Sequence, residues 1–353
     1  MTVSVRLCTG AVDAAAWDSF VASCPQATFF HRIGWRRVLQ EAFGHETYFF
    51  LAEQRSDDQS CETASEIVGV LPLALVRSRL FGNTLASLPF CVYGGVAATT
   101  DAAVLALREA ACALARQLHV DALELRNIAP SNSGWPVKNL YYTFHKAIDA
   151  DNDVNLKAIP NKQRAMVRKG IAAGLVSDED AGTQRLYRVY AESVRNLGTP
   201  VFSRRYLELL RDEFGADCQV LMIVDKGEDV AGVMSFYFRG EVLPYYGGSV
   251  ARARAIKGCN DFMYWELLRR SAEEGLTSFD FGRSKRDTGP YQFKRNWGFE
   301  PEPLAYEYYL VAARQMPDVN PTNPRYRLLV DAWRRLPLPL ANLIGPPLAR
   351  SLG

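Results

Sequence analysis

A near-repeat within the chain constrains its fold more than any other feature. Residues 68–95 read VGVLPLALV…SLPFCVYGG, and residues 230–248 read VAGVMSFYF…VLPYYGG. Each block has the pattern of a strand that contains Gly-Val, a turn, and a second strand that ends in Tyr-Gly-Gly. Apolar residues at helical spacing follow each block, over about 102–118 and about 260–274, and we expect Asn260 to be the N-cap of the second helix.

A short alternating strand follows each predicted helix, ALELR at 122–126 and SFDFG at 278–282. From the second glycine of Tyr-Gly-Gly to the acidic residue of that strand, the spacing is 29 residues in the first block and 32 in the second. This matched order indicates an internal duplication of one αβ unit. Three hairpin-linked strands come before the second helix, at 219–225, 230–239 and 241–250. Since the strand after the helix then runs parallel to its neighbour, we predict an α/β fold with mixed sheets.

The domain boundary is expected where periodicity is lost. A length of 353 residues suggests about two domains. The segment AIDADNDVN at 147–155 has no strand or helix period. We therefore predict an N-terminal domain over 1–150, a C-terminal domain over 151–312 and an amphipathic tail over 313–353.

Composition and charge exclude several classes of protein. A hydrophobic content of 48% with 23% charged residues excludes a largely disordered, fibrous or coiled-coil chain. A net charge of +2 offers no global argument for nucleic-acid binding, so anions must be bound by local basic clusters. Seven scattered cysteines without a C-x-x-C motif predict reduced thiols in an intracellular protein. Four scattered histidines without H-E-x-x-H predict that there is no metal site.

The chain is expected to be cytoplasmic. Its first residues, MTVSVRLCTG, lack the apolar core of a signal peptide. The uncharged run 80–100 contains glycines, an asparagine and a proline, so we predict two buried strands around a turn there, not a spanning helix.

The tail has the pattern of a basic amphipathic helix. Apolar residues recur at helical spacing and arginines flank them: Leu328, Leu329, Ala332, Trp333 and Leu336, with Arg325, Arg327, Arg334 and Arg335. Pro337 and Pro339 then end the helix, and an apolar stretch follows. One interpretation is peripheral contact with the inner face of the membrane, with Trp333 at the headgroup level. The other is docking on the protein's own domains or on a second subunit, and the oligomeric state stays open.

Five stretches carry a resemblance to a known family. They are ATFFHRIGW (27–35), SLPFCVYGG (87–95), NKQRAMVRKGIAAGL (161–175), RNLGTPVFSRRY (195–206) and FDFGRS…GPYQFKRNWGF (279–299). Together they resemble the Fem-type aminoacyl and peptidyl transferases, and most closely the branch associated with exosortase/PEP-CTERM systems. The resemblance covers about 1–312 and implies two tandem acetyltransferase-like (GNAT) domains.

The resemblance also implies a function. The implied enzyme is an acyltransferase that moves an aminoacyl group to an amine acceptor in cell-envelope or exopolysaccharide metabolism. The implied donor is aminoacyl-tRNA, bound by its acceptor stem, the acceptor is lipid-linked or nucleotide-linked, and no cofactor is tightly bound. One alternative is a CoA-dependent N-acyltransferase, and another is a catalytically silent binding protein of the same fold.

One departure bears on the donor. CoA-using relatives carry R/Q-x-x-G-x-G/A before the crossover helix, whereas residues 251–260 read ARARAIKGCN, with Lys257 where a glycine is expected. A glycine-rich turn binds phosphate because no Cβ blocks its backbone amides. We therefore expect CoA to bind weakly and another acyl donor to be used.

The catalytic candidates lie in the last of these stretches, residues 279–299, which we call the terminal block. By the resemblance, Lys294 stabilises the oxyanion or a nearby phosphate; the alternative is a surface cation. Asp280 alternates with two phenylalanines, so we expect it to accept a proton or to orient the substrate-binding candidate Arg283, or else to form a structural pair with it. Tyr291 is the candidate proton donor.

The remaining substrate-binding candidates come from three segments. They are Tyr245 and Tyr246 before Gly247-Gly248, Arg164 and Arg168 at i, i+4 in the basic helix, and His31, Trp35 and Tyr93 in the first domain. The arginines would hold the phosphates of a tRNA or of a linked acceptor. The alternatives are core aromatic residues, a solvated helix face and a buried histidine with its hydrogen bonds satisfied.

Overall fold

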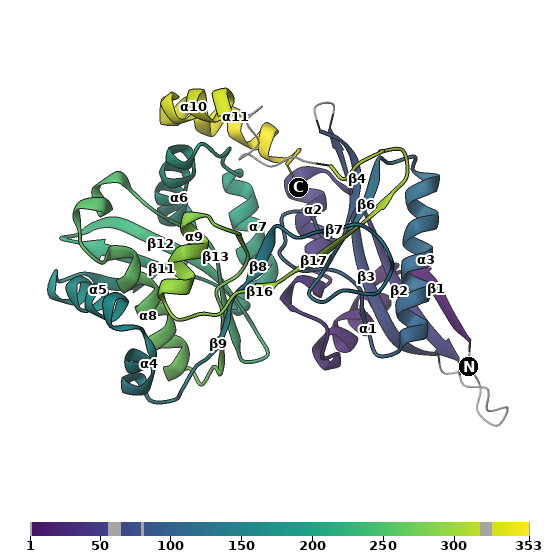
Figure 1. Ribbon diagram of the computed structural model, residues 1–353, viewed down its shortest axis with the longest axis horizontal. Coiled ribbons are helices and arrows are strands. Elements are labelled where there is room, and N and C mark those ends of the chain that lie inside the picture. Colours follow the sequence, from purple (N-terminus) through teal and green to yellow (C-terminus); the bar gives the residue numbers. More distant parts are fainter. Residues whose placement is uncertain (1, 56–64, 79–80, 318–326, 353) are drawn as a thin grey trace. The chain divides into compact units, whose positions relative to one another are not determined.

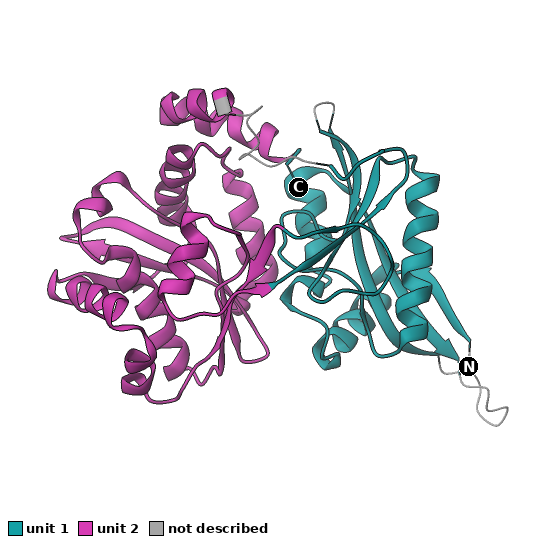
Figure 2. Ribbon diagram, in the orientation of Figure 1, with its two compact units in different colours: residues 1–139, 303–319, 351–353 teal, residues 140–302, 320–350 magenta. Residues whose placement is uncertain are grey.

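The chain forms two compact units. The computed structural model describes residues 2–55, 65–78, 81–317 and 327–352, and only the backbone of residue 327. Unit 1 contains Met1–Asn139, Pro303–Val319 and Ser351–Gly353, and unit 2 contains Leu140–Glu302 and Asn320–Arg350 (Figure 2). These units differ from the predicted ranges because residues 140–150 lie in unit 2 and residues 303–312 lie in unit 1.

Unit 1 is built on an eight-stranded mixed sheet (Figure 1). Its order is β1 (Val3–Leu7), β2 (Glu46–Arg55), β3 (Ser65–Ser78), β4 (Gly82–Ala86), β6 (Ala122–Asn127), β17 (Ala305–Leu310) and β7 (Val137–Lys138), with β5 (Ala97–Ala98) paired to β3. Helix α3 (Asp101–Gln117) covers one face, and α1 (Gly10–Ser23), the 3-10 turn η1 (Phe29–His31) and α2 (Trp35–Phe43) lie on the other. The strands β4 and β6, which α3 connects, are parallel.

Unit 2 repeats this order. Its sheet runs β10 (Val176–Glu179), β11 (Cys218–Asp225), β12 (Glu228–Phe238), β13 (Glu241–Ser249), β14 (Ser278–Asp280) and β9 (His145–Ala147). Helices α6 (Gln184–Leu197) and α7 (Arg204–Phe214), with the 3-10 turn η2 (Gly215–Asp217), separate β10 from β11. The 3-10 turn η3 (Ala251–Ala255) and α8 (Cys259–Glu273) connect the parallel strands β13 and β14. The repeated order confirms the predicted mixed α/β fold with two copies of one architecture.

Smaller elements complete unit 2. Helices α4 (Asn152–Ala158) and α5 (Asn161–Ala172) come before β10, and α9 (Gly289–Asn296) follows β14. A small sheet has the order β15 (Ser284–Lys285), β8 (Tyr141–Thr143) and β16 (Glu302–Pro303). The aromatic core beneath α8 includes Phe279 and Phe281, so these alternating residues face the same packed layer.

In each sheet, the strand that follows the parallel pair comes from an unexpected part of the chain. β9 precedes the other strands of the unit 2 sheet and pairs antiparallel with β14, whereas β17 follows all of them and pairs antiparallel with β6 in unit 1. Tyr306 anchors β17: its side chain is fully buried, its hydroxyl donates to the carbonyl of Val92, and the guanidinium of Arg126 lies over its ring. The chain therefore returns to unit 1 after the sheet of unit 2, so the boundary between the units is not a single cut near residue 150.

Two local predictions need correction. The N-cap of α8 is Gly258, not Asn260, which lies in the first turn of the helix. In the first repeat, Tyr-Gly-Gly lies outside the sheet because β4 ends at Ala86. The guanidinium of Arg126 holds this departing loop by donating to the carbonyls of Leu88 and Cys91, at 3.1 and 2.8 Å.

The uncharged run 80–100 contains β4 and β5, in agreement with two strands, although residue 80 lies outside the described residues. Within the described ranges, no helix is both long enough and apolar enough to cross a membrane.

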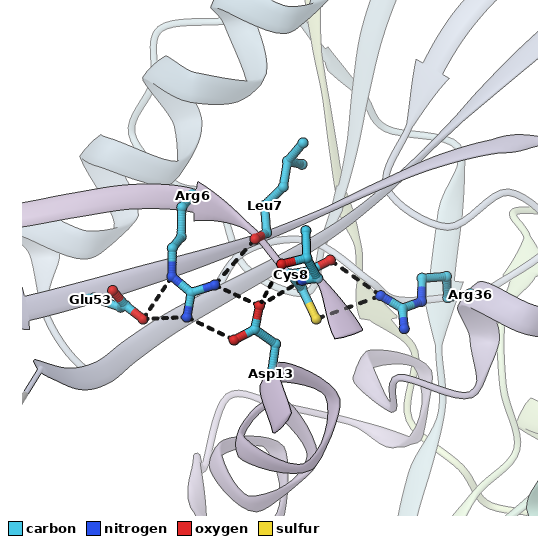
Figure 3. A network of polar contacts seen from close by, with 7 residues as sticks. Arg6, Leu7, Cys8, Asp13, Arg36 and Glu53 are labelled. Carbon is cyan, nitrogen blue, oxygen red and sulfur yellow. Dashed lines mark hydrogen bonds and ion pairs between the residues drawn. The ribbon is translucent and has the colours of Figure 1, made fainter. Parts of the chain in front are cut away.

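Ion pairs join the first elements of unit 1 (Figure 3). The guanidinium of Arg6 donates to Asp13 at the start of α1 and to Glu53 on β2. Arg36, next to the predicted site residue Trp35, donates to the carbonyl and Sγ of Cys8 at 3.3 and 3.7 Å. These contacts fix α1 and α2 to the sheet.

The tail forms two helices that pack on unit 2, α10 (Arg327–Arg335) and α11 (Leu338–Ala349). Pro337 separates them, as the predicted helix stop implies, but the apolar stretch beyond it is helical. A Cβ on Gly198, at the end of α6, would lie 2.5 Å from Val330 of α10. Trp333 is only 9% exposed, so it packs against the protein, in agreement with the docking interpretation.

Candidate active site

The parallel strands β13 and β14 separate after two residue pairs. Glu241 is paired with Ser278 and Val242 with Phe279, and β13 then continues to Ser249 while β14 ends at Asp280. Against β12, the register shifts so that Tyr245 is an extra residue between the paired positions of Pro244 and Tyr246. Such a bulge bends a strand and increases its local twist. The chain thus opens the sheet where the terminal block begins.

Lys294 lies buried beside the end of β14. Its side chain comes from α9, and its Nζ donates to the carbonyls of Gly282 and Arg283 at 2.8 and 3.2 Å. The ammonium also lies over the rings of Phe144 and Phe281, at 5.3 and 5.4 Å from their centroids. At 8% exposure Lys294 is a core residue, so the alternative of a surface cation is wrong.

Burial changes the acidity of this ammonium. Removal from water lowers the pKa of Lys294 to about 7, the charge of Asp280 opposes this shift, and Arg283 adds to it. Near neutral pH the side chain therefore exists in both protonation states.

Asp280 is fully buried and holds the turn that receives Lys294. Its Oδ1 accepts from the backbone N–H of Gly282 at 2.7 Å and from the hydroxyl of Thr143 at 3.2 Å. Its Oδ2 lies 3.3 Å from Nε2 of His145 on β9. These contacts indicate a positioning residue more than an exposed proton acceptor.

His145, which the sequence patterns did not single out, lies beside Asp280. His145 and Asp280 are register partners across β9 and β14, and Glu241 lies on the neighbouring strand. Burial would lower the pKa of His145, but the hydrogen bond and charge of Asp280, with Glu241 and Glu302, raise it. Burial and the Asp280 charge raise the pKa of Glu241. His145, Glu241 and Asp280 are the described residues that could together hold a metal ion.

The aromatic candidates surround the same strands. Tyr246 is buried, and its hydroxyl lies 2.7 Å from that of Tyr206 on α7. Tyr245 is partly exposed and meets the ring of Tyr246 edge-on at 4.8 Å. Tyr291 packs edge-on against Phe144 at 5.4 Å. Tyr245 and Tyr246 therefore share one aromatic cluster, and Tyr291 packs against the same phenylalanine ring that lies beneath the Lys294 ammonium.

Arg283 turns toward the small sheet of unit 2. Its guanidinium carbon lies 4.4 Å from the centroid of the Tyr141 ring, and its backbone carbonyl accepts from Lys294. The glycine pair after Tyr246 has a packing reason: a Cβ on Gly248 would lie 2.6 Å from Cβ of Ser193 on α6. That close approach of a helix explains the glycine without a substrate.

The basic helix α5 packs against α8, and buried Gln163 of α5 donates to Asp261 of α8 at 3.0 Å. Val167 and Gly170 are buried, and a Cβ on Gly170 would lie 2.6 Å from Cβ of Phe262. Arg168 is exposed on the other side and Arg164 is partly exposed, which agrees with their predicted shared face. Within the described part of the chain, Arg168 forms no ion pair, whereas Arg164 contacts Asn161.

Helix α5 also packs against the turn before α8. Gly258 has φ +84°, and a Cβ there would lie 2.1 Å from the carbonyl oxygen of Met166 on α5. The single glycine of the 251–260 loop is thus required by helix packing. This is where a glycine-rich phosphate loop would otherwise begin α8.

The three candidates of unit 1 are core residues. His31 is 2% exposed; its Nδ1 accepts from the backbone N–H of Thr28 at 3.0 Å, and its Nε2 lies 2.9 Å from the carbonyl of Gly95. Trp35 is fully buried against Phe30, and Tyr93 also packs edge-on against Phe30, at 5.9 Å. The structure gives them packing and hydrogen-bonding roles, and substrate binding by them stays a prediction.

The comparisons with known proteins agree with this geometry. Residues 157–295 match the family model described as an acetyltransferase (GNAT) domain. Among curated proteins, no sequence matches the chain significantly. Among solved structures, the chain is similar to FemX, with a TM-score of 0.67 and 15% identity over 93% of this chain and 100% of that chain.

Two further structures have the same arrangement of elements. L-PGS from Bacillus licheniformis has a TM-score of 0.55 and 13% identity, over 92% of this chain and 97% of that chain. A tandem GNAT protein from the clavulanic acid biosynthesis pathway has a TM-score of 0.55 and 14% identity, over 89% of this chain and 100% of that chain. The predicted resemblance is thereby confirmed in the fold. Residues 157–295 match the acetyltransferase (GNAT) domain model, and the chain has the fold of the tandem GNAT protein.

Proposed function

We propose that this chain transfers an aminoacyl group from an activated ester to an amine, at the separating strands β13 and β14 of unit 2. The observation that carries the proposal is the buried Lys294 beside the end of β14. An ammonium has three N–H donors, and the carbonyls of Gly282 and Arg283 accept two of them. The third is available to an oxyanion, and in a low-dielectric site such a donor acts more strongly than in water.

The proposed reaction needs little other chemistry. The acceptor amine attacks the carbonyl carbon of the ester in its uncharged form, and the tetrahedral oxyanion is stabilised by Lys294. Collapse breaks the ester C–O bond, the leaving hydroxyl takes a proton for which Tyr291 is the proposed donor, and the attacking nitrogen loses its proton to water. Asp280 positions the turn at Gly282 that accepts from Lys294.

The donor is proposed to be aminoacyl-tRNA. The packing of α5 against Gly258 supports this choice, because it explains the lone glycine without a bound pyrophosphate. The exposed Arg168 and partly exposed Arg164 offer charges for the phosphates of an acceptor stem or of a lipid-linked or nucleotide-linked acceptor. One structural neighbour is named a putative lysylphosphatidylglycerol synthetase, and a lysyl group is an aminoacyl group.

A role in cell-envelope or exopolysaccharide metabolism follows from the resemblance of the motifs. The tail supports peripheral contact with a membrane in that setting. Its outer side carries Leu328, Leu329 and Leu343, which are 83%, 67% and 73% exposed, near the exposed Arg334 and Arg335.

A CoA-dependent N-acyltransferase is the second candidate, favoured by the likeness to the tandem GNAT protein from the clavulanic acid pathway, whose structure was determined without AcCoA. The test pairs two measurements on the full chain: transfer of a labelled amino acid from aminoacyl-tRNA to amine acceptors, and calorimetric titration with acetyl-CoA. We expect transfer and no tight CoA binding. A low-micromolar dissociation constant for acetyl-CoA without transfer from tRNA supports the second candidate, and neither activity indicates a silent binding protein.

A further inference from the structure

Three strands of unit 2 bring one imidazole and two carboxylates together. His145 lies on β9, Glu241 begins β13 and Asp280 ends β14. The register places these side chains on one face, because His145 opposes Asp280 and Glu241 opposes Ser278, two residues before Asp280. One ligand atom from each lies within 4.8 Å of the others.

The two carboxylates are also held from behind by hydrogen bonds. Oδ1 of Asp280 accepts from Thr143 and Gly282, while Oδ2 faces His145 at 3.3 Å. Oε2 of Glu241 accepts from the hydroxyl of Ser278 at 3.0 Å, which leaves its other oxygen for a ligand.

Glu302 lies behind the imidazole as a charge partner, with its Oε2 3.6 Å from Nδ1 of His145, which is beyond hydrogen-bond distance. Metal ligands in proteins are commonly oriented by such partners, and a carboxylate behind a histidine is a frequent one.

We propose that His145, Glu241 and Asp280 form a binding site for a divalent transition metal ion, with Zn²⁺ as the ion that this ligand set fits best. Zn²⁺ binds histidine nitrogen and carboxylate oxygen, and three protein ligands leave a fourth position for water. Ligand atoms of a tetrahedral zinc site lie about 3.4 Å apart, so a small rotation of the partly exposed His145 or Glu241 side chain closes the set.

The ion would reach the site from the exposed side. The side chains of His145 and Glu302 are 29% and 56% exposed, whereas that of Asp280 is fully buried. Bound there, the ion joins β9 to β13 and β14 and fixes the carboxylate that holds the turn at Gly282. It is a positioning element for the end of β14 and takes no part in the transfer steps proposed above, so the two proposals stand separately.

The test is titration of the chelator-stripped full chain with Zn²⁺, followed by calorimetry and thermal unfolding. We expect one equivalent to bind and to raise the melting temperature. Even a partner behind a ligand contributes about 10–100-fold to affinity, so Glu241→Gln and His145→Asn should each weaken binding at least about 10-fold. The matched controls Glu300→Gln and His119→Asn, at exposed positions, should bind as the wild type does.

Two further measurements separate this site from others. Mg²⁺ and Ca²⁺, which prefer oxygen ligands, should not displace Zn²⁺ from a site that contains an imidazole. Bound Co²⁺ should show the absorption of nitrogen and oxygen ligation without the strong sulfur-to-cobalt band that cysteine thiolates add. The proposal is overturned if the folded wild type binds no Zn²⁺. It is equally overturned if folded Glu241→Gln and His145→Asn, checked by circular dichroism, bind Zn²⁺ as tightly as the wild type does. In that case the three groups are only a charge-paired cluster.

Discussion

Burial of Lys294 removes its ammonium from water, and this loss of hydration disfavours the charged form. Two carbonyls and two aromatic rings favour the ammonium, but loss of hydration lowers the pKa of this side chain to about 7. In the unfolded chain the same group titrates at 10.5. Buried ionisable groups with shifted pKa values are typical of functional sites, where stability is lowered in favour of activity.

A pH dependence of stability follows from these two values. Between pH 7 and 10.5 the unfolded state holds a proton on Lys294 that the folded state has lost. The free energy of unfolding contributed by this residue therefore rises with pH in that window, by at most about 1.4 kcal/mol per pH unit. Urea unfolding at pH 7, 8 and 9 measures this effect. The free energy of unfolding of the wild type should rise with pH relative to that of Lys294→Met. A constant difference would mean that Lys294 keeps its proton.

Among the elements, helices α5 and α8 show why one glycine is required. Gly258 and Gly227 have nearly equal positive φ angles, +84° and +83°, but only Gly258 would place a Cβ against a neighbour, the carbonyl of Met166. For Gly227, in the turn between β11 and β12, there is open space.

Alanine at these two glycines should therefore have unequal effects. Gly227→Ala should cost about 1–2 kcal/mol, the usual penalty of the left-handed region. Gly258→Ala should cost clearly more, because α5 must also move. Chemical unfolding of both variants measures the difference. Equal losses would show that α5 does not press on this turn.

The tail offers a second test at this scale. Removing residues 321–353 uncovers the end of α6 at Gly198, on which Val330 packs. We expect the shortened chain to unfold at a lower temperature and to aggregate, measured by light scattering. Co-sedimentation of the full chain with anionic liposomes, compared with Leu328→Ser/Leu329→Ser, tests the membrane contact separately. If the shortened chain is as stable as the full one, the tail does not dock.

The helices and central strands were predictable from the sequence because each repeats a long pattern. The helix expected at 102–118 is Asp101–Gln117, and the one expected at 260–274 is Cys259–Glu273. The strands β9 and β17 were not predictable, since they have three and six residues and each pairs with a strand more than a hundred residues away. The same separation hid the meeting of His145 with Asp280. Lys294 was found through motif resemblance, but its burial required the fold.

In the whole molecule, each sheet is completed by a strand from outside its own repeat. β17 carries Tyr306, which is fully buried and contacts the loop at Val92 in unit 1. A chain divided at residue 150 would leave unit 1 without this strand. Unit 1 therefore depends on residues that follow the whole sheet of unit 2 in the sequence.

Tyr306→Ala tests this dependence. Loss of a buried aromatic side chain typically costs about 3–5 kcal/mol. Amide hydrogen exchange should become faster in β4 and β6 of unit 1 and stay unchanged in β11 and β12 of unit 2. Equal acceleration in both units would contradict the assignment of β17 to unit 1 alone.

The measurement that most directly tests the central claim is single-turnover aminoacyl transfer by Lys294→Met beside its matched control Arg295→Met. The two residues are neighbours on α9, but Lys294 is buried at the end of β14 and Arg295 is exposed. Removing one oxyanion donor typically lowers the rate about 10²–10³-fold. We predict that loss for Lys294→Met, with a folded protein by circular dichroism, and a rate within a few-fold of wild type for Arg295→Met. A Lys294→Met rate equal to that of the control would contradict the proposed site.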